Sequence, residues 1–156
     1  MRSMWFSKKQ ADQLSTQGRA GSAAPVARQV TTKSRGDAAE AAALACLTGA
    51  GLRWVESNYR TPGRGGGEID LVMRAPDGTL VFVEVRQRSN ASHGGAGASI
   101  GGAKQRRIIF AARHYLMRFA SPPPCRFDVV LVHGALSGGR SPGADIEWLP
   151  AAFDAS

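Results

Sequence analysis

Two segments in the middle of the chain alternate apolar and polar residues with the period of two that indicates β-strands. They run from Glu68 to Met73 and from Leu80 to Arg86, and a Pro-Asp-Gly turn sequence lies between them. This pattern predicts a β-hairpin. Because side chains in strands point alternately to opposite faces, antiparallel pairing would place Asp70 and Glu84 on the same side of one sheet. Two carboxylates among so many apolar residues need a compensating partner.

Two segments with helical character flank this hairpin in the sequence. Residues 36–50 are rich in Ala and Leu, which favour helix. We expect Ser34 to cap a helix that begins near Arg35, with Asp37 in its first turn. Further along, apolar residues recur at helical spacing over residues 108–119, before a run of prolines ends the pattern.

Three further segments have the β-branched and aromatic composition of strands. They are residues 54–59, residues 126–132 and, as a short edge strand, residues 146–149. The resulting order is α-β-β-β-α-β-β, without an internal repeat. This order predicts one α/β domain with a mixed central sheet flanked by helices.

Positive charge is concentrated at the start of the chain. The 156 residues carry a net charge of +8, and residues 1–34 contain six basic residues and one acidic residue. This segment is rich in small and polar residues and has no sustained period. We therefore expect a disordered basic extension followed by a folded domain over residues 35–156. The extension is either dispensable, which we favour slightly, or an arm that strengthens contact with phosphates.

Cysteine spacing and hydropathy restrict the class of protein. Cys46 and Cys125 lie far apart and do not have metal-ligand spacing. No apolar run approaches the roughly 20 residues that a membrane helix needs. We therefore expect a protein of the reducing cytoplasm that has no membrane partner.

The two hairpin acids have the residue types of a metal site. Asp70 and Glu84 supply the hard oxygen ligands that Mg²⁺ or Mn²⁺ prefers, and Arg86 follows Glu84 on the same face. The order Asp, thirteen residues, Glu, one residue and a cation resembles the nuclease motif PD-(D/E)XK. Such an ion would polarise a scissile phosphate and activate water, and Arg86 would stabilise the developing charge. Taken alone, this spacing has many chance matches.

Three residues outside the hairpin extend the candidate site. Glu40 lies in the first predicted helix, where it either approaches the sheet as a third carboxylate or faces solvent and pairs with Arg35. Lys104 and Arg107 lie at the start of the second predicted helix. Their positive charges and the free backbone amides there could bind a phosphate group. The alternative is that both side chains are simply solvated at the helix start. Asp128, in a predicted strand, is assigned a structural role as the partner of a neighbouring base.

Six short motifs, in the order of the predicted elements, resemble the UPF0102 (YraN-like) family. That family is similar to Holliday-junction resolvases and other restriction-endonuclease-like proteins. The motifs lie at residues 36–40, 58–60, 67–71, 82–86, 104–107 and 126–130, and the resemblance spans roughly residues 35–153. It implies a restriction-endonuclease-like core that binds DNA, with branched DNA as one candidate substrate, and a Mg²⁺- or Mn²⁺-dependent endonuclease.

The resemblance also implies a role for each candidate residue. Asp70 and Glu84 would hold the metal, and Glu40 would assist it or orient water. The nucleic acid would be contacted by the cations Arg86, Lys104 and Arg107, the first two of them at the reacting phosphate.

Arg86 departs from the nuclease motif, which ends in Lys. Because Arg keeps its proton, Arg86 can stabilise charge on a phosphate but cannot act as a base. This difference leaves open a non-catalytic nucleic-acid-binding module of the same fold, with RNA or DNA as its ligand. A protein-interaction domain with solvated acids is a third alternative. A homodimer would suit a two-fold branched substrate, but the sequence indicates no interface.

Overall fold

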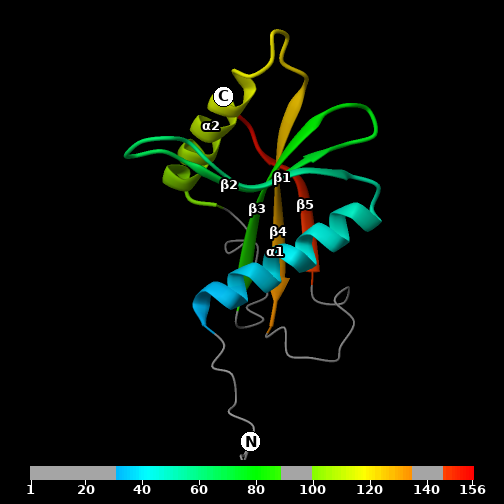
Figure 1. Ribbon diagram of the computed structural model, residues 1–156. Helices are drawn as coiled ribbons and strands as arrows, with labels where there is room; N and C mark the ends of the chain where they lie inside the picture. The colour runs from blue at the N-terminus through cyan, green and yellow to red at the C-terminus, as the bar shows by residue number, and fades with distance from the viewer. Residues whose placement is uncertain (1–30, 89–99, 135–145) are drawn as a thin grey trace, which may run out of the picture.

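The computed structural model describes residues 31–88, 100–134 and 146–156 (Figure 1). Its helices and strands follow one another in the predicted order: α1 (Thr32–Gly49), β1 (Arg53–Arg60), β2 (Glu68–Arg74), β3 (Leu80–Arg88), α2 (Gly102–Leu116), β4 (Cys125–His133) and β5 (Ile146–Phe153). The extension that we expect to be disordered lies almost entirely outside the described residues. None of the described helices is both long enough and apolar enough to cross a membrane.

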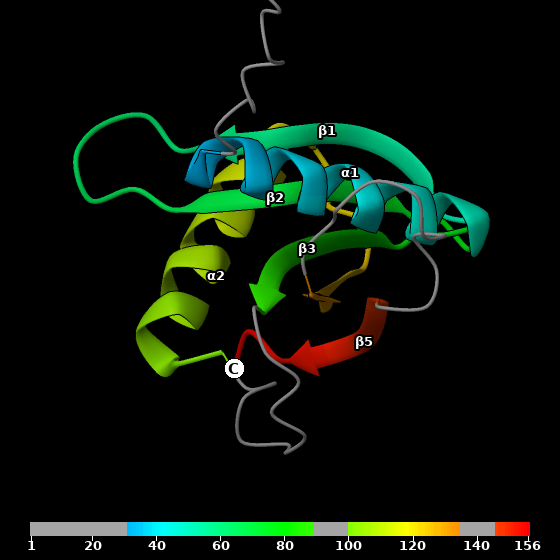
Figure 2. The same ribbon diagram turned by 90° about the horizontal axis from the view of Figure 1, so that it is seen from below.

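The five strands form one open sheet in sequence order. Neighbouring strands are antiparallel, except that β3 and β4 are parallel and are connected through α2. Parallel neighbours require such a crossover, whereas antiparallel neighbours need only a turn. The two helices lie on opposite faces of the twisted sheet (Figure 1, Figure 2). The predicted mixed sheet flanked by helices is confirmed, and it is compatible with a restriction-endonuclease-like core.

Each face of the sheet has its own apolar core. On one face the buried residues of α1 recur every four positions, at Ala39, Ala43 and Leu47, and pack against β2, β3 and β4. On the other face the buried residues of α2 pack against the same three strands. Because both faces are covered, the central strands are apolar on both sides, and an acid within them lies beside the core.

The alternation of side chains along β2 is interrupted at Asp70. Strict alternation would put Ile69 and Leu71 on one face, but Ile69 packs in the α2 core and Leu71 in the α1 core. The backbone pairing of β2 with β3 also ends at Leu71, which lies opposite Val83. The two strands therefore separate where the two acids lie.

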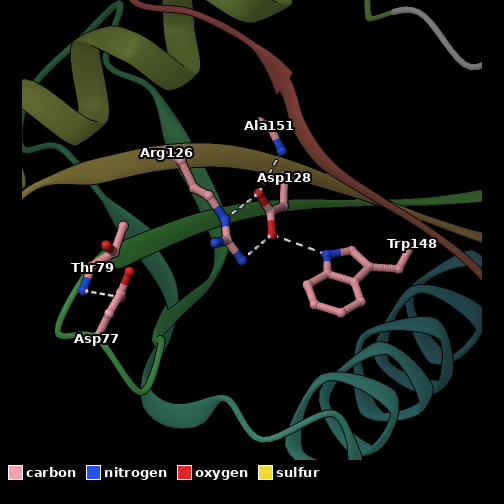
Figure 3. Close-up of polar contacts among 6 residues, drawn as sticks. All are labelled: Asp77, Thr79, Arg126, Asp128, Trp148 and Ala151. Atoms are coloured by element: carbon pink, nitrogen blue, oxygen red, sulfur yellow. Dashed lines mark hydrogen bonds and ion pairs between the residues drawn. The ribbon is translucent and has the colours of Figure 1, made fainter.

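The turn between β2 and β3 has the geometry that its Pro-Asp-Gly sequence predicts. The Ala75 carbonyl accepts a hydrogen bond from the Gly78 amide at 2.9 Å, and the Asp77 carboxylate accepts one from the Thr79 amide at 3.0 Å (Figure 3). Gly78 has a φ of +90°, which glycine adopts without a steric penalty. This short turn fixes the register of the hairpin, which places Asp70 beside Glu84.

The start of α1 differs from the prediction. The N-cap is Thr31, whose hydroxyl accepts a hydrogen bond from the Ser34 amide at 3.2 Å, so Ser34 lies inside the helix. Asp37 consequently lies beyond the first turn, which contains no acid. The Ser34 prediction is wrong because Thr and Ser cap helices almost equally well, and composition does not choose between them. At the other end Gly51, with a φ of +99°, terminates the helix.

Asp128 holds β4 and β5 together. Its fully buried carboxylate accepts hydrogen bonds from the Arg126 guanidinium at 3.0 and 3.3 Å, from the Trp148 indole at 2.9 Å and from the Ala151 amide at 2.9 Å (Figure 3). Every donor comes from β4 itself or from β5. The structural role predicted for Asp128 as the partner of a neighbouring base is therefore confirmed.

The elements β5 and α2 end at residues other than those predicted. The edge strand β5 continues past Leu149 to Phe153, because the Asp128 carboxylate receives the Ala151 amide where the backbone ladder shifts its register. The helix α2 ends at Leu116, earlier than its apolar spacing predicts. Phe119 lies in the turn that follows but still packs against the α2 core, which explains its helical spacing.

Candidate functional site

Asp70 is held where β2 and β3 separate. Its Oδ2 atom accepts a hydrogen bond from the Val85 backbone amide at 2.8 Å. In a regular antiparallel ladder that amide would donate to a backbone carbonyl of the neighbouring strand. The carboxylate therefore occupies the place of a backbone acceptor, and this position fixes it between the two strands at the edge of the core.

Glu84, in β3, brings the second carboxyl group to the same point. Only 7% of the residue is exposed, and its carboxyl group lies within hydrogen-bonding reach of the Asp70 carboxyl group. The structure therefore places the two acids together, as the antiparallel hairpin predicts. Their role in binding a metal is a separate matter and stays a prediction.

Burial raises the pKa of both acids. Desolvation is the main cause that raises the pKa of Glu84 to about 7, and the negative charge of Asp70 adds to it. Desolvation also raises the pKa of Asp70, although the Val85 amide opposes this shift. A protonated Glu84 would carry a donor within reach of the Asp70 carboxylate, so that the pair would hold one negative charge where two are disfavoured.

Lys104 supplies the positive charge that faces this pair. Its Nζ atom lies 3.3 Å from Oε1 of Glu84, and the Lys104 side chain is 45% exposed. The other carboxylate oxygen, Oε2 of Glu84, is buried and has no hydrogen-bond partner. A buried carboxylate oxygen without a donor is costly, so this atom is available to a cation.

Glu40 approaches the acid pair from α1 but has a different partner. Its Oε2 atom accepts a hydrogen bond from the Asn58 side-chain amide at 3.1 Å. Burial is the main cause that raises the pKa of Glu40, and the nearby charge of Asp70 adds to it. The predicted alternative, a pair between Glu40 and Arg35, does not form among the described residues.

Asn58 is a residue of this region that the sequence analysis did not assign to the site. It lies in β1 with a φ of +54°, a left-handed backbone conformation that Asn adopts more readily than most residues. A cavity of about 260 Å³ opens beside it between α1 and the sheet. Its lining residues are Asp37, Glu40, Ala41, Leu44, Ser57, Asn58 and Leu71. The sequence signal for Asn58 was its place in the motif at residues 58–60, near the end of a predicted strand.

The two predicted arginines are both exposed. Arg86 is exposed in β3, two residues after Glu84, so alternation places it on the Glu84 side of the strand. Arg107 is exposed near the start of α2 and forms no ion pair with a described residue. Glu68, at the start of β2, pairs with Arg60 at 3.0 Å, and its negative charge contributes to raising the pKa values of Asp70 and Glu40.

The two central acids fit a Mg²⁺-type ion only with further ligands. Within residues 31–88, 100–134 and 146–156, no three His, Cys, Asp or Glu side chains gather closely enough to hold a metal ion. Mg²⁺ commonly takes one or two protein carboxylates and completes its six oxygens with water and substrate phosphate. The carboxyl groups of Asp70 and Glu84 match that donor set, and Oε2 of Glu84 has no hydrogen-bond partner. The predicted contribution of Glu40 would come through its charge or a bound water.

Comparison with known proteins identifies a family. The family model described as "Uncharacterised protein family UPF0102" matches residues 39–132, a narrower span than the predicted resemblance but one that contains every candidate site residue. A UPF0102 protein of Polaromonas naphthalenivorans is 82% identical over 153 residues, which is 98% of this chain and 100% of that protein. A UPF0102 protein of Albidiferax ferrireducens is 67% identical over 125 residues, which is 80% of this chain and 91% of that protein.

Proposed function

Because this chain belongs to the uncharacterised protein family UPF0102, whose name assigns no activity, we propose its function from the site itself. The protein binds DNA and hydrolyses phosphodiester bonds in a reaction that depends on Mg²⁺ or Mn²⁺. Branched DNA is one candidate substrate. The observation that carries the proposal is the convergence of Asp70 and Glu84 at the separation of two strands, with a buried oxygen that lacks a donor and with Lys104 beside it.

Each residue of the site has a defined task in this proposal. Asp70 is prepositioned by the Val85 amide, so its carboxylate does not need to reorganise when it binds a cation. Glu84 loses its shared proton on binding and presents the oxygen that was buried without a donor. When bound, the ion would polarise the scissile phosphate and lower the pKa of a water molecule.

The cations act on the phosphate. Lys104, at the start of α2, can exchange its contact with Glu84 for a phosphate oxygen, because its side chain is partly exposed. Arg86 keeps its charge throughout and stabilises negative charge on the phosphate. Glu40 and Asn58 lie on the α1 side, where their hydrogen-bonded pair could orient water.

Cleavage of DNA tests this proposal directly. A labelled four-way junction and a supercoiled plasmid are incubated with the purified protein and Mg²⁺ or Mn²⁺, and EDTA is added to a parallel sample. We expect strand breaks only when the metal is present, and we expect Asp70→Asn to abolish them. Asp77→Asn is the matched control, because Asp77 is an exposed acid in the hairpin turn. Equal cleavage by Asp70→Asn and the wild type would refute the assigned site.

A non-catalytic nucleic-acid-binding module is the second candidate. Two observations favour it: Arg86 stands where the nuclease motif has Lys, and no third carboxylate joins the pair among the described residues. This alternative predicts DNA binding that persists in EDTA, weakens steeply with salt and leaves the substrate intact. A mobility-shift assay and the cleavage assay, both with the same four-way junction, distinguish the two candidate functions.

A further inference from the structure

The loop between β1 and β2, residues 61–67, is fixed at its base; we call it the β1–β2 finger. The Thr61 amide donates to the Gly67 carbonyl at 3.1 Å, and the Gly67 amide donates to the Thr61 hydroxyl at 2.9 Å. The base also packs directly on α2, since a Cβ atom at Gly67 would come within 1.9 Å of the Arg107 carbonyl oxygen. The finger therefore leaves the domain from a defined position beside α2.

Arg64 lies at the tip of this finger. It stands between Gly63 and Gly65, whose φ angles of +89° and +78° allow the chain to reverse direction there. Arg64 is exposed, forms no ion pair with a described residue, and is the only charged residue of the finger. By contrast, Arg60, just before the finger, is neutralised by Glu68 at 3.0 Å. The tip thus presents one uncompensated positive charge.

The finger and the start of α2 project on the same side of the molecule (Figure 2). Three exposed cations lie in the first turns of α2, at Lys104, Arg106 and Arg107. Of these, Lys104 contacts Glu84 at 3.3 Å, and the Arg107 backbone packs against the base of the finger that carries Arg64. Charge of this sign and distribution is complementary to a phosphate backbone.

The distance between the finger tip and the acid pair corresponds to several nucleotides. Asp70 lies three residue steps after Gly67 at the base of the finger, which is about 10 Å along a strand. Half of the finger adds roughly another 10 Å. A separation of about 20 Å corresponds to about six nucleotide steps along a double helix. A duplex holds phosphates rigidly at that separation, whereas a single strand does not.

We propose that the β1–β2 finger is a second nucleic-acid contact that is specific for duplex DNA. Arg64 contacts the backbone of the double helix while a phosphate several steps away lies at the acid pair. This inference rests on the proposed function, and it adds that the substrate contains a duplex arm beside the reacting phosphate. The finger would add little to the affinity for flexible single-stranded DNA.

Binding measured without metal tests the inference separately from catalysis. Fluorescence anisotropy is recorded in EDTA with a labelled duplex of about 20 base pairs and with one of its single strands, at several salt concentrations. We expect Arg64→Ala to weaken duplex binding roughly three- to tenfold and to reduce its salt slope by about one, with a smaller effect on the single strand. Arg64→Lys should retain most of the affinity, because the charge remains.

The control variant is Arg53→Ala. Arg53 is exposed at the opposite end of β1 and also lacks an ion-pair partner among the described residues, so this variant should bind like the wild type. If the wild type binds duplex DNA and Arg64→Ala binds it equally well, the inference is wrong while the proposed function stands. Equal losses on duplex and single strand also contradict it. If the wild type binds no DNA even at low salt, the proposed function itself fails.

Discussion

At the scale of single residues, the charge of Glu84 can be balanced in three ways. A proton shared with Asp70 neutralises it, Lys104 pairs with it at 3.3 Å, or a divalent ion can take both carboxylates. The proton, Lys104 and the divalent ion compete with one another, because all three bind the same buried carboxyl group. Competition among them gives measurable consequences that do not require the substrate to be known.

The first consequence is a pH dependence of stability. Glu84 keeps its proton up to about pH 7 in the folded state but has an ordinary pKa of 4.5 when unfolded. Between these values the folded state binds more protons, so the free energy of unfolding falls as pH rises. The full pKa shift of Glu84 corresponds to up to about 3 kcal/mol in the free energy of unfolding. Urea denaturation in EDTA should show this fall in the wild type and a flatter profile in Glu84→Gln. Parallel profiles for the two proteins would contradict the assigned shift.

The second consequence concerns Lys104 as a competitor of the metal. At about pH 8, above the raised pKa of Glu84, Lys104→Met should bind Mn²⁺ about two- to fivefold more tightly than the wild type in the absence of DNA. The reason is that the ammonium group holds the same carboxylate and repels the ion. Calorimetric titration measures the affinity, with Arg113→Met as a control on an exposed part of α2. Weaker metal binding by Lys104→Met would show that Lys104 supports the ion instead.

At the scale of secondary structure, two polar arrangements connect elements that local sequence does not connect. The Asp128 cluster ties β5 to β4, and the base of the β1–β2 finger packs on α2 through Gly67. The Asp128 cluster replaces regular backbone pairing where the register between β4 and β5 shifts. The base of the finger can pack on α2 only because Gly67 has no side chain. Each therefore depends on one residue that cannot be replaced conservatively.

Asp128→Asn should destabilise the fold. The amide nitrogen of Asn cannot accept a hydrogen bond, and the loss of charge leaves Arg126 without its bidentate partner beside a fully buried position. We expect a loss of about 2–4 kcal/mol in the free energy of unfolding. Urea denaturation measures it, and Asp77→Asn, at an exposed turn residue, should leave it nearly unchanged. A similar small change in both variants would be inconsistent with the structural role of Asp128.

Gly67→Ala should displace the finger from α2. The added Cβ atom would meet the Arg107 carbonyl oxygen at 1.9 Å, so backbone must move. The expected cost is about 1–3 kcal/mol in the free energy of unfolding, together with faster proteolysis within residues 61–67. Gly63→Ala is a useful comparison, since nothing lies within 4 Å of its Cβ position and only its φ of +89° is unfavourable. Unchanged stability and unchanged proteolysis in Gly67→Ala would argue against this packing.

The sequence predicted those features that depend on local pattern. The hairpin of Asp70 and Glu84 was predictable because the period of two and the Pro-Asp-Gly turn are contained in a single stretch of chain. The pairing of Glu40 with Asn58 was not, since it joins α1 to β1 across the fold. The contact between Lys104 and Glu84 and the hydrogen bond from Ala151 to Asp128 likewise depend on tertiary packing. The start of α1 was predicted wrongly, because Thr31 and Ser34 are chemically interchangeable as N-caps.

At the scale of the whole molecule, the fold gathers the candidate chemistry where the sheet opens. The strands β2 and β3 separate there, α1 approaches from one face, and α2 begins on the other (Figure 1, Figure 2). The acids lie beside the core, whereas the cations of α2 and of the finger are exposed. Buried acids surrounded by exposed cations are an arrangement suited to a metal ion beneath a bound phosphate backbone.

Calorimetric titration with Mn²⁺ at about pH 8, where Glu84 is largely ionised, measures whether Asp70 and Glu84 together bind a divalent ion. We expect the wild type and Asp77→Asn to bind one ion with equal affinity. Asp70→Asn and Glu84→Gln should each lose at least about tenfold in affinity. Binding that is equally tight in these two variants, or no binding by the wild type, would contradict the claim that Asp70 and Glu84 together hold a divalent ion.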